Sequence, residues 1–193
     1  GYGHELTAAE INQVMQHNTY NGMVDESAVY THFKLRDLQK SVSHGTHVMD
    51  LACGPRTVLA QVAGAPPHPD APPSWALADD DASRCDSVAV QLDWANIIDT
   101  SGGSMNVSVM DGLMYILSRC APASTLPVNL SCGTLAGPHS GTSVLEAALA
   151  QLLALHTGEL HIVVPAGHSS QRRTHANETL TKGAHVTVHG TGQ

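Results

Sequence analysis

Apolar and polar positions along the second half of the chain follow two different periods. Short runs rich in β-branched residues predict strands at residues 88–92, 127–131, 161–164 and 185–189. Longer stretches, in which apolar residues recur with helical spacing, predict helices at residues 105–119 and 144–156. Strands that alternate with helices in this way build a parallel sheet. We therefore expect an α/β fold, a parallel sheet flanked by helices on both faces.

Two capping boxes mark helix starts. In Thr7-Ala-Ala-Glu10 the threonine hydroxyl and the glutamate carboxylate each accept a hydrogen bond from a main-chain amide that would otherwise lack a partner, which predicts a helix at residues 8–17. Ser143 and Glu146 have the same spacing at the start of the last predicted helix.

A third helix is predicted at residues 44–53, directly before Gly54-Pro55, a pair that ends helices. Its helical spacing predicts three inward-facing residues, Val48, Leu51 and Ala52.

Residues 64–83 combine five prolines with three consecutive aspartates. Such a composition neither pairs into a sheet nor continues a helix, so we expect an exposed loop. We interpret this segment as a loop and not as a domain boundary. A length of 193 residues suits one domain with its own core, so residues 1–193 are expected to form a single domain.

Composition narrows the class of partner. The chain is 42% hydrophobic and 13% charged, its formal net charge is -8, and its nine Lys and Arg residues form no basic run. Nucleic-acid binding needs concentrated positive charge, and a bilayer span needs about 20 apolar residues, so neither is expected. The four cysteines form no C-x-x-C pair and predict neither a zinc site nor a disulfide framework.

Three stretches carry a family resemblance. Residues 44–50 read HGTHVMD, residues 126–133 read LPVNLSCG and residues 162–168 read IVVPAGH. In this order they resemble the HGTHVAG, VINLSLG and VVAAGN segments of subtilisin-type serine peptidases (peptidase family S8). With DTSGGS at residues 99–104 and GPHSGTS at residues 137–143, which are similar to a bacterial subset of the family, the resemblance covers roughly residues 4–176.

The resemblance implies a subtilisin-like domain that hydrolyses polypeptides through a Ser-His-Asp triad, which needs no cofactor or catalytic metal. It does not determine calcium dependence. It makes His44 the general base, and it puts His168 where the family has the asparagine that donates to the oxyanion. It also implies two substrate-binding segments: a strand that pairs with the peptide main chain, Ser131, Cys132 and Gly133, and a wall of the side-chain pocket, Pro165, Ala166 and Gly167.

The chain departs from the family pattern in three places besides His168. No Asp-Ser-Gly or Asp-Thr-Gly motif precedes His44, no GTSxAxP motif follows His168, and Asp50 replaces the second glycine of HGTHVAG. We therefore expect a partial domain, the middle of a peptidase, that is inactive by itself. The alternative is a catalytically silent homologue that binds a peptide or a partner.

Two serines stand in sequences that resemble nucleophile motifs. Ser143 lies in a Gly-Thr-Ser tripeptide that precedes the oxyanion segment and lacks the following proline. Ser169 follows a predicted strand, but a nucleophile elbow needs glycine where Gln171 stands. Neither is expected to be the nucleophile.

A less favoured alternative is a metal site. His44, His47 and Asp50 lie at positions i, i+3 and i+6 of one predicted helix, so their side chains share part of a helix face. The peptidase motif already accounts for the two histidines and the residues between them.

Overall fold

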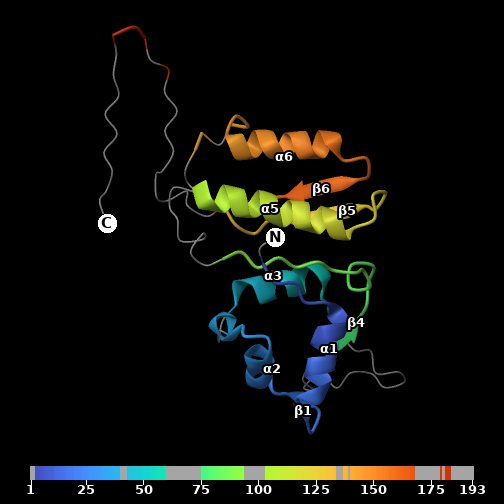
Figure 1. Ribbon diagram of the computed structural model, residues 1–193. Coiled ribbons are helices and arrows are strands. Elements are labelled where there is room, and N and C mark those ends of the chain that lie inside the picture. The colour runs from blue at the N-terminus through green and yellow to red at the C-terminus, as the bar shows by residue number, and fades with distance from the viewer. Residues whose placement is uncertain are drawn as a thin grey trace, which may run out of the picture. The chain divides into compact units, whose positions relative to one another are not determined.

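A computed structural model describes residues 3–39, 43–59, 75–93, 103–133, 137–138, 140–167, 179 and 181–183. The chain divides into two compact units, Gly1–Ala78 and Asp79–Gln193 (Figure 1).

The first unit begins with the predicted helix. Helix α1 spans Ala8–His17, and its capping box is present: Thr7 Oγ1 accepts from the Glu10 amide at 3.3 Å, and Glu10 Oε2 accepts from the Thr7 amide at 2.7 Å. The Thr7 amide, and after it the Thr7 hydroxyl, donate to Glu10 Oε2 and hold the pKa of the Glu10 carboxyl below its ordinary value, because the ionised form is the better acceptor.

A short hairpin and a second helix follow, which the sequence pattern did not predict. Strands β1 (Thr19–Tyr20) and β2 (Met23–Val24) pair antiparallel. Helix α2 spans Glu26–His32, and a 3-10 turn, η1, covers Arg36–Leu38.

Helix α3 spans His44–Cys53 as predicted, and it ends at Gly54, whose amide donates a hydrogen bond to Asp50 O. The prediction of an inward face is wrong for Leu51 and Ala52, which are exposed, whereas Val48 is partly buried. Leu51 is 74% exposed and no residue of α3 is buried. Helical spacing therefore identified the helix here but not a face covered by other elements.

Part of the predicted loop is a strand. Strands β3 (Arg56–Leu59) and β4 (Trp75–Ala78) pair antiparallel, with Thr57 opposite Leu77. The loop prediction is thus wrong for residues 75–78. They follow the last proline of the segment, and each has a main-chain N–H that can donate a hydrogen bond in a sheet. Residues 64–74 of that loop lie outside the described residues.

The second unit contains four predicted elements in the predicted order. These are α5 (Gly103–Arg119), β5 (Leu126–Asn129), α6 (Val144–Leu155) and β6 (Leu160–Val163). The capping box of α6 is present as well. Its hydrogen bonds define where the helix starts.

The prediction of a strand at residues 88–92 is wrong. This segment has no strand partner within the described part of the chain; instead Leu92 packs against the core of the second unit, and Val90 lies over Gly112 of α5. The β-branched run is therefore used for packing on a helix. The strand predicted at residues 185–189 lies outside the described residues.

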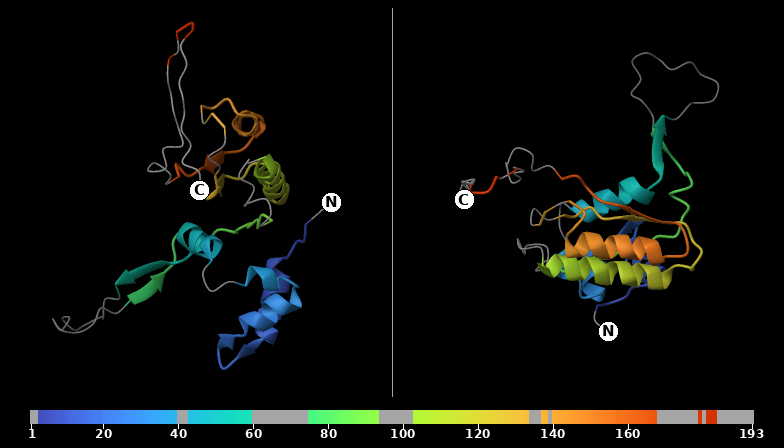
Figure 2. Two further views of the ribbon diagram at one scale, coloured as in Figure 1. Left: turned by 90° about the vertical axis from the view of Figure 1, so that its left-hand side faces the viewer. Right: turned by 90° about the horizontal axis from the view of Figure 1, so that it is seen from above.

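The core of this unit joins one face of α5 to β5. Met105, Val109 and Leu113 recur at helical spacing and are buried with Val128. Around them pack partly buried side chains from α6 and both strands, among them Leu126, Leu145, Leu149, Leu152, Leu160 and Ile162. Helices α5 and α6 lie side by side in both views (Figures 1 and 2), and they cover the same face of the β5–β6 pair. A wider parallel sheet remains a prediction.

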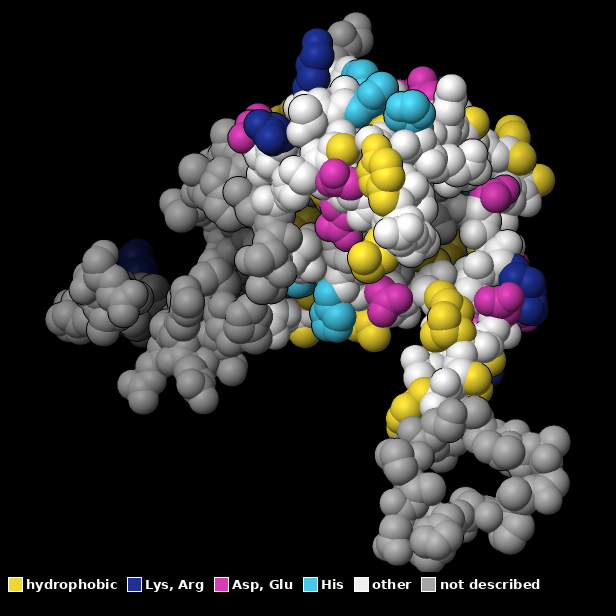
Figure 3. Space-filling model, turned by 90° about the horizontal axis from the view of Figure 1, so that it is seen from below, with side chains coloured by type: hydrophobic (Ala, Val, Ile, Leu, Met, Phe, Trp, Pro, Cys, Tyr) yellow, Lys and Arg dark blue, Asp and Glu magenta, His cyan; other side chains and the backbone are white. Residues whose placement is uncertain are grey.

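Several hydrophobic side chains lie at the surface. Leu77, Val144 and Leu155 are each more than 70% exposed, and hydrophobic groups stand between polar ones on the face in Figure 3. Within the described ranges, every helix lacks the length and apolar character needed to cross a bilayer.

Candidate functional site

Strands β5 and β6 run parallel, which brings two of the predicted site segments to one edge. Asn129 lies opposite Val163, and one further bond runs from the Leu130 amide to Val163 O at 2.9 Å. Residues 131–133 follow β5, and residues 165–167 follow β6. Because the carboxyl ends of parallel strands meet at the same edge of a sheet, both segments leave the strand pair at this edge.

The side chains at this edge are small and open to solvent. Ser131, Gly133, Pro165, Ala166 and Gly167 are exposed. A Cβ added at Gly133 or Gly167 would meet no atom within 4 Å. The main chain is therefore accessible to another chain along both segments.

Cys132 is the exception, because its side chain turns toward the core. It is partly buried and packs against the cluster around Val128, and this burial raises the pKa of its thiol above the ordinary value of 9.0. The thiol is thus protonated at neutral pH and acts as a small apolar group. Two exposed side chains of the same segment contact each other: Asn129 Nδ2 donates to Ser131 Oγ at 2.8 Å.

The edge of β5 away from β6, which is free among the described residues, has a main-chain donor available. In the described part of the chain, β6 is the one strand paired with β5. Successive amides of an extended chain point to opposite edges. Since the Leu130 amide points to β6, the Ser131 amide points away from it, and it donates to no described residue. An extended peptide can accept this hydrogen bond.

His44 is the first residue of α3 and is exposed. Ser43 precedes it and caps the helix, with Oγ 3.4 Å from the Thr46 amide. The His44 imidazole makes no hydrogen bond with any described residue. His44 and the strand ends belong to different compact units.

Three other predicted positions have different outcomes. His168 and Ser169 lie outside the described residues. The Ser143 hydroxyl accepts from the Glu146 amide at 3.2 Å, and the Ser143 amide donates to Glu146 Oε2 at 2.9 Å. Ser143 thus has a structural role as the cap of α6. Among the described residues no group of three His, Cys, Asp or Glu side chains is arranged to hold a metal ion, so nothing supports a site of His44, His47 and Asp50.

No family model, curated protein or solved structure matches this chain. The assignment of an activity therefore depends on the three motifs and on the strand-end geometry.

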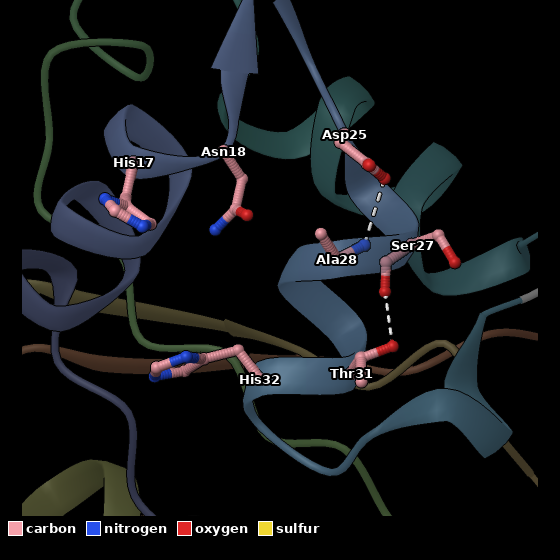
Figure 4. Close-up of a pocket in the computed structure, with 7 residues that line it drawn as sticks. All are labelled: His17, Asn18, Asp25, Ser27, Ala28, Thr31 and His32. Atoms are coloured by element: carbon pink, nitrogen blue, oxygen red, sulfur yellow. Dashed lines mark hydrogen bonds between the residues drawn. The ribbon is translucent and has the colours of Figure 1, made fainter.

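A hollow between α1 and α2 was not predicted. It has a volume of about 470 Å³ and is lined by His17, Asn18, Asp25, Ser27, Ala28, Thr31 and His32 (Figure 4). Two of its polar groups are already used locally: Asp25 Oδ1 accepts from the Ala28 amide at 3.0 Å, and Thr31 Oγ1 donates to Ser27 O at 2.7 Å. The placement of a histidine in the last turn of each helix is the one sequence signal of this hollow.

Proposed function

We propose that this chain carries the general-base segment and the peptide-binding segments of a subtilisin-type serine endopeptidase. The observation that supports this most is the shared edge of β5 and β6. Two segments resemble the family's substrate strand and pocket wall. A whole helix separates them in sequence, yet both follow directly on strands that are paired with each other.

In this proposal a substrate lies extended along residues 131–133 and adds a strand to the free edge of β5. Main-chain hydrogen bonds such as that of the Ser131 amide supply affinity without regard to sequence, as in other cases of strand addition. The pocket formed by Pro165, Ala166 and Gly167 then accepts a side chain, since these small residues leave space. Cys132 supports the strand from the core side.

The chemistry of the proposed activity requires groups beyond those of this site. His44 would take the proton of a serine hydroxyl as that oxygen attacks the peptide carbonyl, and an aspartate would hold the imidazole in the correct tautomer. The 193 residues contain no motif for either partner. We therefore expect the chain to bind extended polypeptides and not to cleave them.

A matched pair of variants tests the peptide edge. Ser131→Pro removes the amide that points to the free edge, and Ser131→Ala keeps it while removing the same hydroxyl. One lost hydrogen bond of about 1 kcal/mol weakens binding of an unstructured casein fragment about fivefold. Calorimetric titration should show this weakening in Ser131→Pro relative to Ser131→Ala. Equal affinities of the two variants would contradict the proposal.

A catalytically silent homologue is the second candidate, and Asp50 and His168, which depart from the family's motifs, favour it. Transfer of residues 44–50 into an active peptidase distinguishes the peptidase segment from the silent homologue. An active subtilisin-type peptidase whose HGTHVAG segment is replaced by HGTHVMD should keep cleaving a fluorogenic peptide if residues 44–50 are competent for base catalysis. Loss of turnover in a folded graft would favour the silent homologue.

A further inference from the structure

The turn between β1 and β2 has an unusual backbone at both central positions. Asn21 has φ 51° and Gly22 has φ 78°, so both occupy the left-handed region, as two-residue hairpin turns of the I′ type require. The hairpin is short, with Tyr20 opposite Met23 and Thr19 opposite Val24. A hairpin of this size is marginal alone, so it opens at little cost.

The reacting groups of this turn are accessible. Asn21 and Gly22 are both exposed, and a Cβ added at Gly22 would meet no atom within 4 Å. The carboxamide of Asn21 makes no hydrogen bond with any described residue. Nothing in the described structure holds the side chain away from the main-chain nitrogen of Gly22 that follows it.

We propose that Asn21 is a site of spontaneous deamidation that opens the β1–β2 hairpin as the protein ages. When the hairpin frays, the Gly22 nitrogen loses its proton to hydroxide and bonds to Asn21 Cγ. The bond from Cγ to the side-chain nitrogen breaks, and ammonia leaves with a proton from water. Water then hydrolyses the five-membered imide at either carbonyl, which gives aspartate or isoaspartate at position 21.

The isoaspartate product changes the hairpin. Its main chain runs through the side-chain carbons, so the turn gains a methylene and no longer matches the pairing of Tyr20 with Met23. At the base of the hairpin, the Asp25 amide donates a hydrogen bond to Asn18 O at 2.8 Å. Asn18 and Asp25 both line the hollow between α1 and α2, so the hollow changes with the hairpin.

Peptide mapping by mass spectrometry after incubation of the full chain in mildly alkaline buffer tests the site. Asn12 is the internal comparison, because it is also exposed but lies within α1 and precedes a glutamine. Asn21 should deamidate at least about tenfold faster than Asn12, a barrier lower by about 1.4 kcal/mol. Similar rates at the two positions would overturn the proposal.

The structural consequence has its own control. Asn21→Gly removes the carboxamide and still allows the left-handed backbone, so this variant should keep the Tyr20–Met23 pairing after ageing. In the aged wild type, cross-strand amide contacts between β1 and β2 should disappear in proportion to isoaspartate. Intact pairing in molecules that contain isoaspartate would refute the hairpin opening.

Discussion

Gly158 lies where two loops meet at the amino end of the β5–β6 pair. A Cβ at this position would lie 2.9 Å from both Pro122 O and Ser124 O and 3.1 Å from His156 Nε2. The two oxygens are main-chain atoms, so Gly158→Ala forces the backbone of one loop to move. The Leu126 amide donates to Glu159 O at 2.7 Å next to this contact, so the movement reaches the start of the strand pair.

The magnitude follows from two opposing terms. Overpacking against backbone costs about 1–3 kcal/mol, and the smaller unfolded-state entropy of alanine returns about 0.4–1 kcal/mol. At the midpoints of the two ranges, about 2 and about 0.7 kcal/mol, the net loss of unfolding free energy in Gly158→Ala is about 1.3 kcal/mol.

Urea denaturation of the full chain, monitored by circular dichroism, measures this loss as a lower midpoint at unchanged slope. Gly133→Ala is the matched control in the same unit. Its added Cβ meets no atom within 4 Å, so its stability should lie within about 0.5 kcal/mol of wild type. If Gly158→Ala were as stable as Gly133→Ala, the close approach of the two loops would be refuted.

Three further predictions concern single side chains. Lys34 has φ 59° just after α2, so Lys34→Gly should raise the unfolding free energy by about 0.5–1 kcal/mol in urea denaturation, whereas Lys34→Ala should not. The pKa of Glu10 is lower in the folded protein than in the unfolded chain, so the ionised carboxylate stabilises the fold above the unfolded pKa, and this effect is lost as pH falls through the folded pKa. Glu10→Gln should therefore reduce the fall of Tm with decreasing pH at the acid end of the profile. An unchanged fall of Tm would contradict the capping box. The raised pKa of Cys132 predicts slower alkylation by iodoacetamide at neutral pH than at the exposed Cys85, as peptide mapping would show, and equal rates would contradict its burial.

Helix starts were the most predictable feature of the fold. Thr7 with Glu10 and Ser143 with Glu146 are local devices, whose hydrogen bonds join residues three positions apart. No distant contact is needed to form them, so the sequence was sufficient. The same holds for Gly54 at the end of α3.

Features that depend on distant partners were less predictable. The β-branched run at residues 88–92 was predicted as a strand, yet Val90 and Leu92 pack against α5. The register of β4 with β3 could not be read from residues 75–78 alone, because pairing depends on residues 56–59. For the site, the sequence predicted both segments, residues 131–133 and 165–167, and their order along the chain. That they leave the sheet at one edge follows only from the parallel register of β5 with β6.

The most direct test of the peptide-binding edge is a backbone amide NMR titration of the full chain with an unstructured casein fragment. We expect shifts concentrated at the amides of residues 131–133 and 166–167, with the helical amides of α1 unchanged. Shifts confined to other surfaces, or none at saturating peptide, would contradict the proposed peptide-binding edge.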